Sequence, residues 1–229
     1  MKITRLKSER CEKVKKISIM GGCLLAALIL YGLIRKAFIK PADDGASQFA
    51  QYIQQSEGIL AFFEGIGYLA SKPGIISLLA IAIVVLSLLF RHYLQPLMIG
   101  LAVYLGDVLN KFLKSVTARE RPPEPLHLEE GFSFPSGHAM VGVIFYGLFA
   151  YMIIEKIKSP ALKKGIWAAV VLLMALIGIS RVITNSHYVT DVIGGYFIGF
   201  VFLLGTILIY EWAKNLLAAA KKKKGGISA

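Results

Sequence analysis

Three short polar strings interrupt an otherwise apolar chain of 229 residues, and they combine basic residues, two histidines and a carboxylate. The first runs over residues 114–122, the second over residues 135–138 and the third over residues 180–191. Charged groups beside hydrophobic segments are costly and therefore indicate function. Lysine and arginine bind oxyanions, a histidine can attack or donate a proton, and an aspartate can orient the attacking ring. These residue types favour phosphoryl-transfer chemistry within a membrane.

The third string supplies the candidate nucleophile. His187 and Asp191 are four residues apart at the expected start of the last helix, so they share one helical face. A carboxylate on one imidazole nitrogen fixes the tautomer and supports positive charge on the ring. No serine or cysteine lies nearby in a nucleophile motif, so the imidazole itself is expected to attack phosphorus and form phosphohistidine. Taken alone, the pair could equally be a structural cap of a helix.

The second string supplies a proton donor and a phosphate cradle. Ser136, Gly137 and His138 stand where a loop becomes a helix, and a helix N-terminus presents unpaired N–H groups to an anion. Gly137 lets the backbone approach phosphate closely, and Ser136 adds a hydroxyl or an N-cap. We expect His138 to protonate the leaving oxygen, because the pKa of histidine lies near neutrality.

Basic residues complete the candidate site. Arginine binds phosphate oxygens in bidentate fashion and lysine acts as a point charge, so Lys114, Arg121 and Arg181 are expected to stabilise the charge of the transferring group. Arg119 and Lys111 are interpreted instead as basic residues of the membrane edge that only snorkel to the surface.

Metal catalysis is not expected. The acidic residues around the strings are scattered without ligand-type spacing to the histidines: Asp107, Glu120, Glu124, Glu129 and Glu130. The cations that phosphate requires are supplied by side chains, and no cofactor is expected.

The apolar stretches predict an all-α integral membrane protein with six transmembrane helices. The chain is 56% hydrophobic with a mean hydropathy of +0.64, and each span needs roughly 20 mostly apolar residues. The expected helices lie at about 17–34, 74–90, 93–113, 137–154, 164–180 and 190–212, the third being the most polar. The first is long for a signal peptide and lacks a small-residue cleavage site, so we expect a retained anchor.

Residues 41–73, between the first two spans, carry apolar side chains at helix-like spacing with polar residues between them. This pattern predicts an amphipathic helical segment in the membrane interface. Such a segment could gate the approach of a lipid or simply cap the helix ends, and the sequence leaves both open.

The charge pattern predicts the orientation. Of the 26 Lys and Arg residues, 17 fall on the side of the N-terminus, so the positive-inside rule places both termini in the cytoplasm. The loops that carry the three polar strings then lie together on the extracytoplasmic face of the plasma membrane. The net charge of +12 is gathered at the termini and in one loop without interleaved aromatics, so nucleic-acid binding is not expected. Nothing indicates an obligate protein partner.

We expect one domain over residues 1–229. It includes a basic N-terminal extension at 1–16 and a lysine-rich tail at 221–229, and the sequence leaves open whether that tail is native.

In order and spacing, the three strings resemble the signature of the type 2 phosphatidic acid phosphatase (PAP2) superfamily: Lys-x6-Arg-Pro, Pro-Ser-Gly-His and Ser-Arg-x5-His-x3-Asp. The match spans residues 114–191, and the six-helix layout extends it. Every fixed position is present: Lys114, Arg121, Pro122, Pro135, Ser136, Gly137, His138, Ser180, Arg181, His187 and Asp191. In length and layout the chain is similar to bacterial members that act on lipid phosphates.

The resemblance implies a metal-independent lipid phosphate phosphatase. It implies that His187 is the nucleophile, Asp191 its partner and His138 the general acid. The implied phosphate ligands are Lys114, Arg121, Ser136, Gly137 and Arg181. Phosphatidylglycerophosphate, undecaprenyl pyrophosphate and phosphatidic acid are the implied substrates, and the sequence does not choose among them.

Three alternatives remain open. A phosphotransferase of the same family would pass the phosphoryl group to a sugar or an alcohol. Halide oxidation by bound vanadate shares the signature, but the membrane helices disfavour it. A lipid-phosphate binding or transport protein without turnover would need only the cations, whereas this chain also carries the nucleophile, the acid and the carboxylate.

Overall fold

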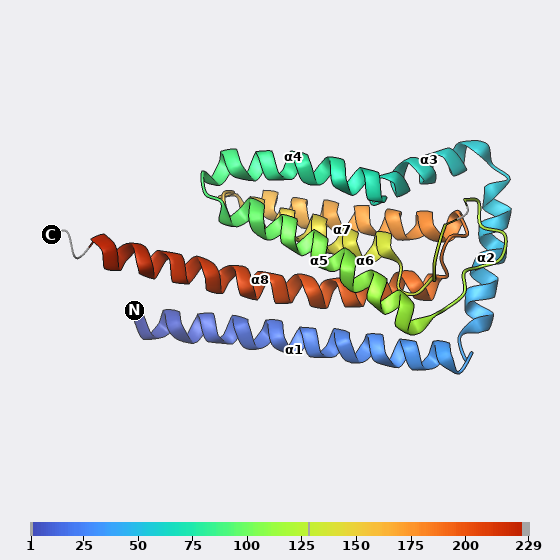
Figure 1. The fold of residues 1–229 in the computed structure, drawn as a ribbon, viewed down its shortest axis with the longest axis horizontal. Helices are drawn as coiled ribbons and strands as arrows, with labels where there is room; N and C mark the ends of the chain where they lie inside the picture. The colour runs from blue at the N-terminus through green and yellow to red at the C-terminus, as the bar shows by residue number, and fades with distance from the viewer. Residues whose placement is uncertain (1, 128, 226–229) are drawn as a thin grey trace.

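The computed structural model describes residues 2–127 and 129–225, and within them the chain forms eight α-helices and no strands (Figure 1). In chain order they are α1 (Lys2–Arg35), α2 (Lys40–Gln54), α3 (Glu57–Tyr68), α4 (Lys72–Phe90), α5 (Leu94–Thr117), α6 (Gly137–Ile154), α7 (Pro160–Ile183) and α8 (Val189–Gly225). Six of these, all but α2 and α3, are long and apolar enough to cross a membrane. The prediction of an all-α protein with six spans is confirmed.

Helices α5 and α7 extend past their predicted ends, and this places two site residues on helices instead of in loops. Helix α5 continues four residues past the predicted end at 113, to Thr117, so Lys114 lies on its last turn and not in the following loop. Helix α7 continues to Ile183 and therefore carries Arg181. The extension of α5 is mainly polar and that of α7 begins with Arg181, so hydropathy alone does not detect them.

The segment between the first two spans forms two helices with a break at residues 55 and 56. Helix α2 runs across the end of the bundle, and α3 leads back toward α4 (Figure 1). Helix α2 contacts α7 and α8, and α3 packs along α7. The amphipathic segment is therefore packed over the helix ends that carry the polar strings.

Helix α6 lies at the centre of the bundle and contacts α4, α5, α7 and α8. Over half of its span is buried (56%), against 6% for the span of α1. Glycines bring its neighbour α8 close: a Cβ on Gly199 would stand 2.6 Å from the Met140 carbonyl oxygen, and one on Gly147 would stand 2.4 Å from the Leu203 side chain. Small residues at such crossings let membrane helices approach closely.

The start of α1 and the end of α8 lie at one end of the bundle, and all three polar strings lie at the other (Figure 1). The basic extension belongs to α1 from Lys2 onward, and the lysine tail continues α8 as far as Gly225. Residue 1 of the extension and residues 226–229 of the tail lie outside the described residues.

Candidate active site

The His187–Asp191 pair stands at the junction of α7 and α8. His187 lies in the connecting turn and Asp191 in the first turn of α8, so the pair bridges a turn and a helix instead of sharing one helical face as predicted. The His187 Nδ1 atom is 3.5 Å from Asp191 Oδ2, and the two side chains are 1% and 0% exposed. The backbone N–H of Tyr188 donates to the same carboxylate oxygen, at 3.0 Å. The predicted pair is thus assembled away from solvent.

The other ring nitrogen of His187 faces an arginine and a carboxylate. Its Nε2 atom is 3.4 Å from Arg121 Nη1 and 3.9 Å from Glu129 Oε2. Glu129 Oε2 is also 3.0 Å from Arg121 Nη1, and Glu129 Oε1 forms an ion pair with Arg181. A carboxylate therefore bridges two predicted phosphate ligands in front of the ring. Sequence reasoning missed Glu129 because it is one of several acidic residues in an irregular loop.

The charges of this cluster set the protonation of its members outside the spans. Burial, followed by the nearby cations Lys114, Arg181 and Arg121, holds the pKa of His187 well below its ordinary value, and Glu129 opposes them. Burial raises the pKa of Glu129, but Arg181, the largest of the lowering influences, and the other nearby positive groups outweigh it, so the net shift is downward. The ring is therefore held neutral, as a nucleophile must be, and the carboxylate is held ionised.

The cations also fix the loop between α5 and α6. Arg121 donates to the carbonyl oxygens of Gly131 and Ser186, at 3.0 and 2.8 Å. Lys114 donates to the carbonyl oxygen of Phe132, at 2.7 Å. Arg181 is buried, and its Nε atom has no hydrogen-bond partner among the described residues. One donor of this guanidinium is therefore left unpaired among the described residues.

The Pro-Ser-Gly-His string forms the start of α6 and is tied to α8. The Ser136 side chain accepts from the N–H of Ala139 as an N-cap, and the Ser136 N–H donates to the Asp191 carbonyl oxygen at 3.0 Å. A Cβ on Gly137 would stand 3.2 Å from Asn110 Oδ1, which favours glycine there. His138 is half-buried in the first turn and makes no side-chain hydrogen bond within the described part of the chain.

A cavity of about 350 Å³ opens beside this string, between α4, α5 and α6. Its walls are mainly apolar, including Ile75 and Leu79 of α4 and Val103 of α5, and Gly137 and His138 are among the residues that line it. An apolar cavity with a few polar groups is typical of a site for a small molecule.

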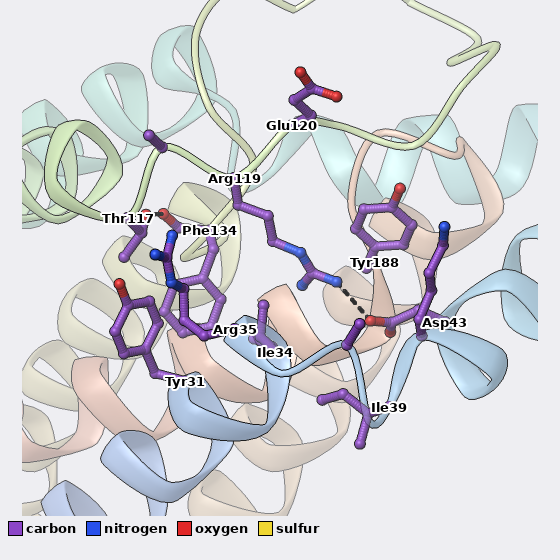
Figure 2. A pocket seen from close by; sticks show the side chains of 13 residues that line it. Tyr31, Ile34, Arg35, Ile39, Asp43, Thr117, Arg119, Glu120, Phe134 and Tyr188 are labelled. Carbon is purple, nitrogen blue, oxygen red and sulfur yellow. Dashed lines mark hydrogen bonds and ion pairs between the residues drawn. The ribbon is translucent and has the colours of Figure 1, made fainter.

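Arg119 is not the surface residue that the sequence suggested. Its guanidinium donates to Asp191 Oδ1 and to Asp43 Oδ2, both at 2.6 Å, and the side chain is only 16% exposed. Figure 2 shows it reaching from the loop toward Asp43 of α2. The interpretation failed because Asp43 lies 76 residues away in a segment without a motif. Lys111, by contrast, is exposed and pairs with Asp107 one turn away on α5.

Comparison with known proteins decides the family. The sequence profile described as the PAP2 superfamily matches residues 92–215. The chain is 33% identical to phosphatidylglycerophosphatase B of Bacillus subtilis over 175 residues, which is 75% of this chain and 85% of the relative. The chain belongs to the PAP2 superfamily. A crystal structure of a transmembrane PAP2-type phosphatidylglycerolphosphate phosphatase from Bacillus subtilis superposes with a TM-score of 0.78 at 30% identity, covering 84% of this chain and 96% of that one.

Membership in the PAP2 superfamily confirms that the chain is a multi-pass membrane enzyme of the lipid phosphatase class. All eight predicted site residues lie at one end of the bundle, but they differ in how they meet. His187, Asp191, Arg121 and Arg181 join one cluster through Glu129 and direct contacts, whereas Lys114 and Ser136 border it through hydrogen bonds to the backbone. Gly137 and His138 follow Ser136 at the start of α6, and no hydrogen bond or ion pair among the described residues joins the His138 side chain to the cluster. No group of three or more potential metal ligands occurs among the residues that were described.

Proposed function

We propose that the protein hydrolyses the terminal phosphate of membrane lipid phosphates through a phosphohistidine on His187. The observation that carries the proposal is the Glu129 carboxylate, which is held by Arg121 and Arg181 with one oxygen 3.9 Å from His187 Nε2. Carboxylate and phosphate oxygens make the same forked pairs with guanidinium groups. A phosphoryl group bound in place of Glu129 would stand directly before the neutral ring nitrogen.

In the first step, His187 Nε2 forms a bond to phosphorus while the bond to the leaving oxygen breaks. The ring becomes positively charged as it attacks, and the buried Asp191 carboxylate near Nδ1 stabilises that charge. Arg121, Arg181 and Lys114 stabilise the charge that spreads over the phosphoryl oxygens. His138 donates its proton to the departing oxygen, which leaves as an alcohol or a phosphate group.

In the second step, water attacks the phosphohistidine. His138, now neutral, accepts a proton from that water, and the bond between phosphorus and Nε2 breaks. Inorganic phosphate leaves, and His187 is again a neutral imidazole. Both protons of the cycle pass through His138, so the reaction needs no external acid.

The lipid reaches this site from the bilayer. The apolar cavity between α4, α5 and α6 is large enough for part of an acyl or prenyl chain, and Gly137 and His138 line it. The headgroup then lies at the level of the polar strings while the chain stays in the hydrocarbon. The charge asymmetry of the loops supports an extracytoplasmic site with both termini in the cytoplasm.

These features favour three candidate substrates. The Bacillus subtilis relative is a phosphatidylglycerophosphatase by name, which favours phosphatidylglycerophosphate. An outward-facing site also suits undecaprenyl pyrophosphate and other lipid phosphates such as phosphatidic acid. The apolar walls of the cavity accept either kind of tail.

The test is phosphate release by the purified protein in EDTA, from phosphatidylglycerophosphate and undecaprenyl pyrophosphate side by side. We expect release from at least one lipid, and we expect His187→Ala to abolish it. The ratio of the kcat/KM values ranks the two lipids. Turnover of His187→Ala near the wild-type rate would remove His187 as the nucleophile, and transfer of phosphate to an alcohol instead of water would identify a phosphotransferase.

The orientation has its own test. Cys11 lies on α1 and is exposed, so a thiol reagent that reaches it can label it. Because the proposal places the N-terminus in the cytoplasm, a membrane-impermeant reagent applied to intact cells should leave Cys11 unlabelled. In a background where both natural cysteines are serine, Glu130→Cys in the exposed loop should be labelled. The reverse pattern would place the site in the cytoplasm.

A further inference from the structure

We propose that Asp43 of α2 and Arg119 of the loop act as a positioning pair that fixes the Asp191 carboxylate against His187. The inference rests on the proposed function, because it assigns a role in the same attack. It adds to the site Asp43, which lies outside the superfamily signature, and Arg119, which occupies one of the variable positions of its first string.

The geometry of Arg119 is that of a clamp between two carboxylates. One terminal nitrogen, Nη1, donates to Asp191 Oδ1 at 2.6 Å and to the Thr190 hydroxyl at 2.7 Å. The other, Nη2, donates to Asp43 Oδ2 at 2.6 Å. The guanidinium also lies over the Tyr188 ring, 4.3 Å from its centroid. These contacts fix both the position and the plane of the group.

Asp43 is held as firmly from the other side. It is 1% exposed, and it accepts from the Thr190 N–H at 3.2 Å and from the Thr190 hydroxyl at 2.7 Å in addition to Arg119. A buried carboxylate is costly unless it is paired and hydrogen-bonded. The buried Asp43 carboxylate is therefore paired and hydrogen-bonded, and it holds Arg119 and the first turn of α8 in place.

The consequence reaches the nucleophile through Asp191. Arg119 holds Oδ1 of Asp191, which leaves Oδ2 directed at the Tyr188 N–H and at His187 Nδ1. The Nδ1 atom is buried and makes no hydrogen bond among the described residues, and Asp191 Oδ2 lies 3.5 Å from it. Two carboxylates around one guanidinium give this cluster a net negative charge, which suits a ring that becomes positive as it attacks.

A cavity gives direct access to the clamp. About 330 Å³ of open space lies between the end of α1, the start of α2 and the loop, and Arg119 and Asp43 line it (Figure 2). Removal of the Arg119 side chain would leave a guanidinium-shaped gap that a small cation can reach from solvent. The clamp can therefore be removed and restored chemically.

The first experiment compares Asp43→Asn with Asp44→Asn. The two residues are neighbours on α2, but Asp44 is exposed. We expect kcat of Asp43→Asn to fall about tenfold because the orienting carboxylate loses its support, with KM changed less than about twofold. Asp44→Asn should match the wild type. Equal kcat values for the two variants would overturn the proposal.

The second experiment uses Arg119→Ala with added guanidinium ion at millimolar concentration. We expect kcat to fall about 100-fold and to recover several-fold with guanidinium but not with tetramethylammonium, which cannot donate hydrogen bonds. Arg119→Lys, which keeps the charge without the fork, should lie between the two. A merely structural role would not respond to the ion.

The outcomes separate the two proposals. A folded Arg119→Ala protein, shown by its thermal unfolding in detergent, that is inactive and not rescued by guanidinium would overturn the positioning role. Normal turnover of both Asp43→Asn and Arg119→Ala would do the same while leaving the phosphatase intact. A wild type that releases no phosphate from any lipid phosphate would instead contradict the proposed function.

Discussion

The two nitrogens of the His187 ring face regions that are built in opposite ways. On the Nδ1 side, Asp191 is fully buried and is held by Arg119, which Asp43 holds in turn. On the Nε2 side, Arg121 and Arg181 hold Glu129, a residue of the connecting loop whose side chain is 28% exposed. In the first region both carboxylates lie in the first turns of packed helices and share one loop arginine, whereas the second depends on a loop carboxylate at the edge of solvent.

The difference separates contacts that must stay fixed throughout the reaction from contacts that must be exchanged when the substrate binds. A carboxylate that orients a catalytic ring must keep its place through the cycle, and burial with several hydrogen bonds provides this. An anion-binding region must exchange its occupant. Glu129 pairs with the buried Arg181 and the half-buried Arg121, and under the proposed function its partly exposed position would allow it to leave when phosphate binds.

The largest expected effect comes from breaking the Nε2 side. Arg181→Met removes a buried cation with a free donor, and we expect kcat/KM to fall about 100-fold to 1,000-fold, as for loss of one oxyanion donor. Arg35→Met, which removes an exposed arginine at the same end of the bundle, is the matched control. Steady-state phosphate release measures both. A rise in KM with kcat unchanged would mean that Arg181 binds the ground state and the transition state equally well.

The acid limb of the pH profile sharpens the comparison further. Since burial and three cations hold the pKa of His187 low, the neutral ring should persist below pH 6.5, the ordinary pKa of histidine, and activity should be lost only as the pH falls through the lowered value. Arg181→Met removes one of the lowering charges, so its acid limb in kcat/KM should move to higher pH. Titration of the substrate phosphate is common to both proteins, so the difference between the profiles reports the ring. Superimposable limbs would show that another group governs the profile.

In both regions the sequence predicts the signature residues far better than the residues that pair with them. Lys114, Arg121, Arg181, His187 and Asp191 are recognisable because fixed spacings carry them to one membrane level. Glu129 is not, since it sits among several acidic residues in an irregular loop and gains its place only from the arginines that fold around it. The spacing within a motif can therefore be read from the sequence. The residue that occupies the site between the arginines in the resting protein depends on how the loop folds.

The clamp on the Nδ1 side shows the same limit across a longer distance. Arg119 and Arg121 are two residues apart and chemically identical, yet one faces Asp191 and the other faces Glu129. Only the path of the loop decides between them. Asp43 belongs to an amphipathic segment whose helical character is evident from its pattern, but the packing of α2 on α7 and α8 selects Asp43 over the adjacent Asp44. Helix positions follow from local periodicity, and contacts between distant helices do not.

The smallest expected effect tests whether Glu129 is an exchangeable occupant. Glu129→Gln keeps the size of the side chain but removes the charge that competes with phosphate for Arg121 and Arg181. We expect inhibition by vanadate, a mimic of five-coordinate phosphorus, to strengthen about twofold to fivefold, the range of a partly exposed ion pair. Glu130→Gln, the next and more exposed residue, should leave inhibition unchanged. Weaker vanadate inhibition in Glu129→Gln would mean that the carboxylate positions the arginines for the anion and does not compete with it. Glu129 would then be a fixed part of the site, as Asp191 is on the Nδ1 side.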